Sequence, residues 1–149
     1  MAYTNKLYGQ VYLGAFGKLI NDLAAAGTTI KCALLLDTYT FNQDTHVSYA
    51  DISSYEVSNS GTNYTTGGVA LTSKSLTYSN KVTTFTADNP SWANATLTAQ
   101  YAVIYDDTTS GAANKKLICC IDFGENKSAS ASTFEIKLSA SGICTFSVS

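Results

Sequence analysis

The chain of 149 residues contains no arginine, one histidine, one proline and one methionine, and only 13% of its residues are charged. Arginine is the side chain best suited to phosphate groups and base edges, and nucleic-acid surfaces are strongly basic. Here the net charge is −2, and Lys115–Lys116 is the only pair of adjacent basic residues. We therefore expect no nucleic-acid partner.

Long apolar runs are also missing. The stretch from Val11 to Ile20 is interrupted by two glycines and a lysine, whereas a membrane span needs roughly 18 apolar residues in succession. The opening "MAYTNKLYGQ" does not place a charged segment before an apolar core, as a secretory signal would. We expect a soluble protein made in a cytoplasm, with no membrane partner.

The single histidine restricts both catalysis and metal binding. A Ser/His/Asp or Cys/His arrangement would have to use His46, which lies in "NQDTH". Asp44 and Asp51 are near it in sequence, but the spacing is not that of a zinc site or a calcium-binding loop. We interpret His46 as a loop histidine bonded to neighbouring backbone and expect no metal and no cofactor. A site formed with Asp44 and Asp51 is the alternative.

Paired acids suited to glycoside hydrolysis are not evident either. Such chemistry needs two carboxyl groups facing each other across a cleft. Asp106 and Asp107 end a strand-like run before "TTSG", so they are expected in a turn and not buried. Asp122 precedes "FGEN" and Glu125 lies within it, and this stretch also resembles a turn. We therefore expect a protein that is not an enzyme.

The glycine-rich stretch 61–68, "GTNYTTGG", differs from nucleotide-binding loops. No Lys-Ser/Thr pair follows it, and no strand–helix unit surrounds it. Gly61, Gly67 and Gly68 are instead expected to adopt positive φ where a loop turns sharply.

The four cysteines lie in apolar, strand-like runs. Adjacent residues of a strand point to opposite faces, so Cys119 and Cys120 cannot share one site. We expect all four to be buried and reduced, with Cys119 on the face of Leu117 and more buried than Cys120. A bridge from Cys144 to one of the adjacent pair is the alternative. The remaining cysteine, Cys32, is expected in a buried strand.

What the chain does contain is the pattern of one mainly antiparallel all-β domain, 1–149, forming a β-sandwich or barrel with short strands and Gly/Asn turns. Residues 1–27 form an N-terminal arm, with a short helix over part of 7–27 where apolar residues recur at helical spacing. The sandwich would occupy 28–149, with a long irregular loop at 37–68 that includes a helical turn near 48–57. Strands are expected at 28–36, 67–80, 81–87, 95–107 and 117–124, and a hairpin at 133–139 and 143–149.

The order of these segments resembles a family of small virion structural proteins of tailed bacteriophages. The pieces that carry the resemblance best are "NQDTH", "GTNYTTGG" and "SWANATLTAQYAVIYDDT", and it extends over 2–148. It implies a virion location and, as partners, the major capsid protein or other virion proteins, with further copies of the chain on the particle. The function implied is that of a capsid decoration protein, which binds the outside of the assembled head. A minor tail, tail-tip or fibre component that contacts host glycans is the alternative.

Ten tyrosines and few charges suit a protein that is packed against others. The resemblance makes the loop region 37–68 the expected contact surface, with Tyr64 offered to a neighbouring subunit. Trp92 is expected to anchor the following strand or to join the interface. The candidate interface residues are Tyr49, Tyr55, Asn63, Tyr64, Gly67, Gly68 and Trp92.

Overall fold

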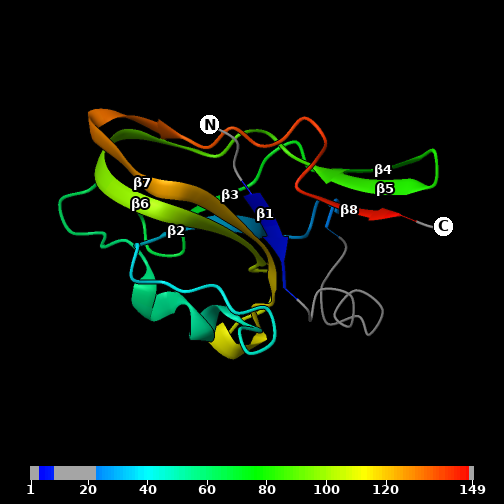
Figure 1. Ribbon diagram of the computed structural model, residues 1–149, viewed down its shortest axis with the longest axis horizontal. Coiled ribbons are helices and arrows are strands. Elements are labelled where there is room, and N and C mark those ends of the chain that lie inside the picture. The colour runs from blue at the N-terminus through cyan, green and yellow to red at the C-terminus, as the bar shows by residue number, and fades with distance from the viewer. Residues whose placement is uncertain (1–3, 9–22, 148–149) are drawn as a thin grey trace.

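The computed structural model describes residues 4–8 and 23–147, which form two antiparallel sheets (Figure 1). The larger sheet has the strand order β1-β7-β6-β2-β3, and the smaller has the order β4-β5-β8. The expectation of a mainly antiparallel all-β chain is confirmed. The strands are β1 Thr4–Leu7, β2 Ile30–Leu35, β3 Val69–Ala70, β4 Ser75–Ser79, β5 Val82–Thr86, β6 Ser91–Asp106, β7 Leu117–Glu135 and β8 Cys144–Ser147.

The N-terminal arm begins as a strand. The helix expected within 7–27 falls largely on 9–22, which lie outside the described residues, but Leu7 ends β1. This strand pairs with β7, from Thr4 opposite Asp122 to Leu7 opposite Cys119. Local periodicity could not reveal it, because its partner lies more than a hundred residues further along the chain.

The antiparallel pair β6–β7 has the longest strands of the fold, and the two strands curve together in Figure 1. Here the expected hairpin of 133–139 with 143–149 is wrong. β7 runs on to Glu135 along β6, and β8 pairs with β5 instead. The turn expected at "FGEN" is also wrong, because Gly124 adopts φ 76° at an irregularity inside β7.

Both faces of the larger sheet are covered, which explains the apolar sequence of its central strands. Cys32 and Ile104 belong to the cluster on one face, whereas Ala33 and Tyr105 belong to the cluster on the other. The first cluster also contains residues from both ends of β6, so the curvature of this strand wraps it around the core. The members from β6 are Trp92, Ala95, Leu97, Ala99, Ala102 and Ile104.

The cysteines are all buried and free, as expected. Cys119 and Cys120 lie in different clusters, which confirms that they face opposite sides of the sheet. Cys120 is nevertheless as buried as Cys119, because the sheet has a covered face on each side. Leu117 does not share the face of Cys119: a register shift inserts Ile118 between their pairings with β6, so the alternation is interrupted.

The irregular segment 36–68 contains two 3₁₀ helices, η1 Tyr49–Asp51 and η2 Ser53–Tyr55, at the expected helical turn. Side chains from this segment complete the second cluster, so it covers one face of the larger sheet. The chain then crosses to the edge strand β3 at Val69–Ala70.

Candidate functional site

The carboxylate of Glu56 joins distant parts of the irregular segment 36–68 to one another. It accepts hydrogen bonds from the Tyr49 hydroxyl, from the Tyr64 hydroxyl at 2.5 Å and from the Gly67 backbone N–H at 2.6 Å. Glu56 itself follows η2 and forms an isolated bridge with Leu35 of β2. The side chain of Glu56 therefore holds three points of the segment together, and its backbone bridge ties them to the sheet.

The tyrosines bound to Glu56 are held as neutral hydrogen-bond donors. Burial raises the pKa of Tyr49 and of Tyr64 well above the usual value, and the neighbouring Glu56 carboxylate raises both further. The Tyr64 hydroxyl also accepts a hydrogen bond from the backbone N–H of Leu34 at 3.0 Å. Its donor and acceptor capacity is thus used inside the molecule.

A local acid sets the start of η1. Asp51 Oδ2 accepts from the backbone N–H of Val47 at 2.9 Å and of Ser48 at 2.8 Å, as a first-turn acid does at a helix N-terminus. Burial acts to raise the pKa of Asp51, but the hydrogen bonds from Ser48 and Val47 outweigh it and hold the pKa below its usual value. This turn directs Tyr49 inward.

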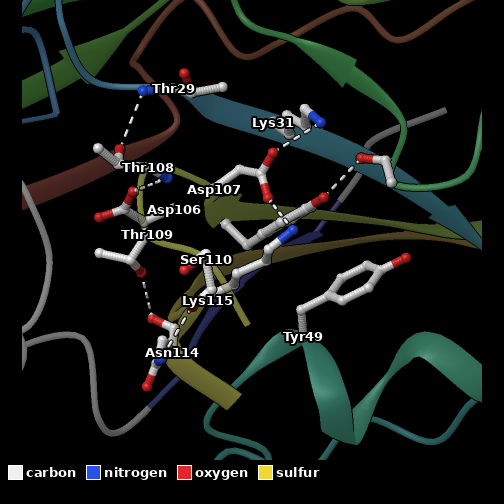
Figure 2. Close-up of polar contacts among 12 residues, drawn as sticks. Thr29, Lys31, Tyr49, Asp106, Asp107, Thr108, Thr109, Ser110, Asn114 and Lys115 are labelled. Carbon is white, nitrogen blue, oxygen red and sulfur yellow. Dashed lines mark hydrogen bonds and ion pairs between the residues drawn. The ribbon is translucent and has the colours of Figure 1, made fainter. Parts of the chain in front are cut away.

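A second carboxylate lies at the end of β6, as Figure 2 shows. Asp107 receives Lys31 Nζ at 2.7 Å and Lys115 Nζ at 2.5 Å, one lysine at each oxygen. Burial acts to raise the pKa of Asp107, but the hydrogen bonds and charges of Lys115 and Lys31 lower it overall. The triad ties β2 to the connection between β6 and β7.

Asp106 and Asp107 were expected in a turn and outside the core, and this was wrong for their burial. Asp106 is only 2% exposed, and one of its oxygens accepts from the Thr108 backbone N–H at 2.9 Å. The Thr108 hydroxyl in turn accepts from the backbone N–H of Thr29 (Figure 2). The acids are drawn inward because hydrogen bonds and two lysines compensate for their lost hydration.

A stack of two tyrosines connects the two carboxylates. The rings of Tyr49 and Tyr105 lie 4.9 Å apart and 25° from parallel, and Lys115 Nζ is 5.7 Å from the Tyr49 ring centroid. The Tyr105 hydroxyl donates to the Gly67 carbonyl oxygen at 2.8 Å. Glu56 and Asp107 thus belong to one continuous polar network beneath the loop, in which charges and donors satisfy one another.

His46 does more than bond to neighbouring backbone. Its backbone N–H donates to the Asn42 carbonyl oxygen. Its ring Nδ1 forms a hydrogen bond with the Tyr39 hydroxyl at 3.0 Å. Tyr39 is bonded in turn to the buried Tyr8 hydroxyl, also at 3.0 Å. Within 4–8 and 23–147, no three His, Cys, Asp or Glu side chains gather as metal ligands.

The structure buries most of the candidate interface residues, and for Trp92 this agrees with the expected anchoring of the following strand. Tyr64 is 3% exposed and packs 6.0 Å from Trp92, itself 4% exposed, because both rings complete the first apolar cluster. Tyr49 is buried by the network described above. Gly67 and Gly68 are buried as well, and a Cβ on Gly68 would lie 1.8 Å from the Cys32 carbonyl oxygen.

Two candidates remain at the surface. Asn63 is exposed at φ 54° and donates through Nδ2 to the Asn94 carbonyl oxygen at 2.8 Å, and Tyr55 is half-buried against Tyr39. Gly61, Gly67 and Gly68 do adopt positive φ as predicted.

The residues that sequence reasoning missed are those that hold the network together: Glu56, Lys31 and Lys115. Only one signal in the sequence pointed to them. The chain has few charged residues and long apolar strands, and a charged side chain that lies near the core needs a partner.

No protein-family model, no curated protein and no solved structure matches the chain. None of the helices in the described part is long and apolar enough to span a membrane. The contacts of the network are therefore the basis for a functional proposal.

Proposed function

We propose that this chain is a non-enzymatic structural protein of a tailed-bacteriophage particle that binds the outside of the assembled head. Its partner would be the major capsid protein, and it would be a permanent part of the virion. The order of the segments and the low charged fraction support this reading. The single observation that carries it is the set of three hydrogen bonds accepted by Glu56.

These bonds make the segment 36–68 a preformed surface. Association is weakened by the entropy lost when loops become ordered, so a loop already fixed to its sheet binds at a lower entropic cost. The inward polar groups are occupied by one another and are not free to act on a substrate. This favours a role in contact over a role in chemistry.

The outward side of the same segment would make the contact. It presents the exposed side chains of Leu36 and Asn63, with Tyr55 half-exposed at the end of η2. Copies that bind the assembled lattice but not its separate subunits would stabilise the lattice by mass action, because their binding free energy is gained only in the assembled state. The exposed charges there are Asp37, Asp44 and Asp51, with no lysine among them. We expect apolar side chains and backbone to make the contact, so the attachment would depend little on salt.

We further propose that the fold is a β-sandwich. Both ends of β6 contribute to one apolar cluster, and the smaller sheet adds Phe85 and Cys144 to that cluster. The part of the β6–β7 pair that curves away from β2 would form one layer together with the smaller sheet. The part of the larger sheet around β2 would form the other layer.

The decisive measurement is the number of copies per particle relative to the major capsid protein. Hundreds of copies are expected for a decoration protein, whereas a few would indicate a tail component. Purified protein is then added to heads that lack it, at low and at high salt, and to isolated tails. Binding to tails alone would replace head decoration by the tail-tip reading.

A surface variant tests the contact itself. Leu36→Lys is expected to weaken attachment to heads by about 30-fold, since losing an apolar interface anchor costs about 2 kcal/mol and 1.4 kcal/mol is tenfold. Ser130→Lys, which adds the same charge at an exposed position of β7, is the matched control and is expected to bind normally. Equal binding by both variants would place the contact elsewhere.

A further inference from the structure

The smaller sheet is amphipathic. Residues directly opposite each other in an antiparallel pair lie on the same face, so the register assigns every side chain to a face. One face is apolar except for Thr83, and the other consists of serines and threonines with Val82. The first carries Leu76, Tyr78, Thr83, Phe85, Cys144 and Phe146, and the second carries Ser75, Thr77, Ser79, Val82, Thr84, Thr86, Thr145 and Ser147.

The apolar face is covered only at its inner end. Phe85 and Cys144 are buried in the first apolar cluster, whereas Leu76 is 39% exposed and Tyr78 is 67% exposed. Figure 1 shows the reason: the sheet projects from the body of the molecule, and β4 and β5 reach away from it. An apolar surface thus extends from the core to the tip of the β4–β5 hairpin.

The outer edge of β4 is free of the usual protection. In the described part of the chain β4 pairs with β5 alone, so one side of its backbone faces outward. Edge strands of soluble proteins commonly carry lysine, proline or a bulge that prevents pairing with another chain. Ser75–Ser79 carries none of these. The preceding Lys74 is turned inward, where its Nζ donates to the Thr28 carbonyl oxygen at 2.7 Å.

We propose that β4 is the pairing edge for a second copy of this chain, with the two β4 strands antiparallel about a two-fold axis at Thr77. In this register Leu76 lies opposite Tyr78 of the second copy, and the reverse pair forms on the other side of the axis. Aromatic–aliphatic cross-strand pairs of this kind stabilise sheets. The two smaller sheets become one continuous sheet with its apolar face unbroken.

The charges at the two ends of the strand also match. The same register brings Lys81, in the hairpin turn, level with Ser73 of the second copy. The Ser73 hydroxyl donates to Asp88 Oδ2 at 2.5 Å, so a carboxylate lies at that level. Lys81 and Asp88 are both exposed, and the two-fold axis repeats their attraction at the other end of the contact.

Self-complementarity identifies the partner as a second copy. A two-fold contact requires one patch to match itself, and here each residue meets a partner of suitable chemistry under a single axis. Five residues a side form a small contact compared with a standard interface of about 800 Å² per partner, so the dimer is weak in dilute solution. The inference does not depend on the proposed function.

Engineered cysteines test the axis directly. Residues opposite each other in an antiparallel pair have Cα atoms about 4.5–5.5 Å apart, which a disulfide can bridge. Thr77→Cys faces its own copy and is expected to form a cross-linked dimer under mild oxidation in concentrated protein. Ser79→Cys alone is the control, because its two copies lie about 14 Å apart at 3.4 Å per residue. Mixing Ser75→Cys with Ser79→Cys restores cross-linking.

The native cysteines are buried and do not compete in this reaction. Equal cross-linking of Thr77→Cys and Ser79→Cys would show random collision, and no cross-linking of Thr77→Cys would show that the edge does not pair. Either result overturns the proposal.

Sedimentation of the full chain gives an independent measurement. Tyr78→Lys is expected to weaken dimerisation by at least about 10-fold, since it replaces an apolar anchor near the axis by a charge. Thr145→Lys adds a charge to the other edge and the other face, and it is expected to dimerise as the unaltered chain does. Equal dimerisation of the two variants would overturn the proposal, whatever the outcome of binding to heads.

Discussion

The backbone N–H of Leu34 donates to the hydroxyl of Tyr64, so a central strand and the tip of a long loop are joined at 3.0 Å. The same hydroxyl donates to Glu56, which makes Tyr64 the link between the sheet and the network under the loop. The ring of Tyr64 is buried, so its role in the structure is to hold the loop in shape from within.

Removing that hydroxyl should destabilise the protein without changing its apolar packing. Tyr64→Phe leaves the Leu34 N–H without its acceptor and removes one donor from Glu56. We expect the free energy of unfolding to fall by about 1–3 kcal/mol, the cost of a buried polar group left unpaired. Denaturant unfolding measures this. Tyr78→Phe, at a mostly exposed ring, is the control, and a loss as large there would contradict the role of the Tyr64 network.

Substitutions at two glycines with similar φ measure the cost of steric crowding separately from the cost of backbone strain. Gly61 has φ 71° with no atom within 4 Å of an added Cβ, whereas Gly68 has φ 76° and its Cβ would meet the Cys32 carbonyl oxygen. Gly61→Ala should cost about 1–2 kcal/mol for the left-handed conformation alone. Gly68→Ala should cost at least about 1–3 kcal/mol more, because the loop must move off β2. Equal midpoints in thermal unfolding would show that the loop is not packed against β2.

The thiols should be unreactive in the folded protein. Burial raises the pKa of Cys144 to about 11 and that of Cys120 to about 12, and thiolates are the reactive species. We expect no labelling of either by a thiol reagent at neutral pH until denaturant is added, and then labelling of all four cysteines. Rapid labelling of Cys120 in native protein would contradict the covered second face of the sheet.

The free energy of unfolding should fall in acid because Asp107 becomes protonated. Its folded pKa is lowered, so its contribution is fully present above the unfolded value of about 3.9 and is lost as the pH falls through the folded pKa. Asp107→Asn removes the charge that Lys31 and Lys115 share, and it should cost about 1.5–3 kcal/mol at neutral pH. The difference from the unaltered chain should shrink below about pH 4. A constant difference from pH 7 to pH 2 would show that the ion pairs are not its cause.

Local patterns predicted the strands whose two faces are both apolar. The segments 28–36 and 95–107 contain β2 and most of β6, because runs of buried residues leave a clear signal in sequence. The same signal found only the first part of β7, as 117–124, because Gly124 and the polar residues after it resembled a turn although β6 continues alongside. A strand that crosses from a covered to an exposed region loses its alternation.

The candidate site was less predictable than the fold. Tyr64 and Glu56 lie in an irregular segment with no period, so nothing in the sequence states which side chains point inward. Asp107 looked like an ordinary turn acid because Lys31, one of its partners, lies in a strand far away in sequence. Polar contacts between residues far apart in sequence therefore determine which side chains are buried and which stay exposed.

The pairing of β1 with β7 has a consequence for synthesis. Lys6 of β1 and Asp122 of β7 are joined by an ion pair although 116 positions separate them in the chain. At about 5–20 residues per second, a ribosome needs about 6–23 seconds to make the partner after it has made β1. During that interval the first strand can have no sheet to join. A chaperone or a neighbouring nascent chain therefore has its best opportunity to bind β1 during this interval, before β7 is available to pair with it.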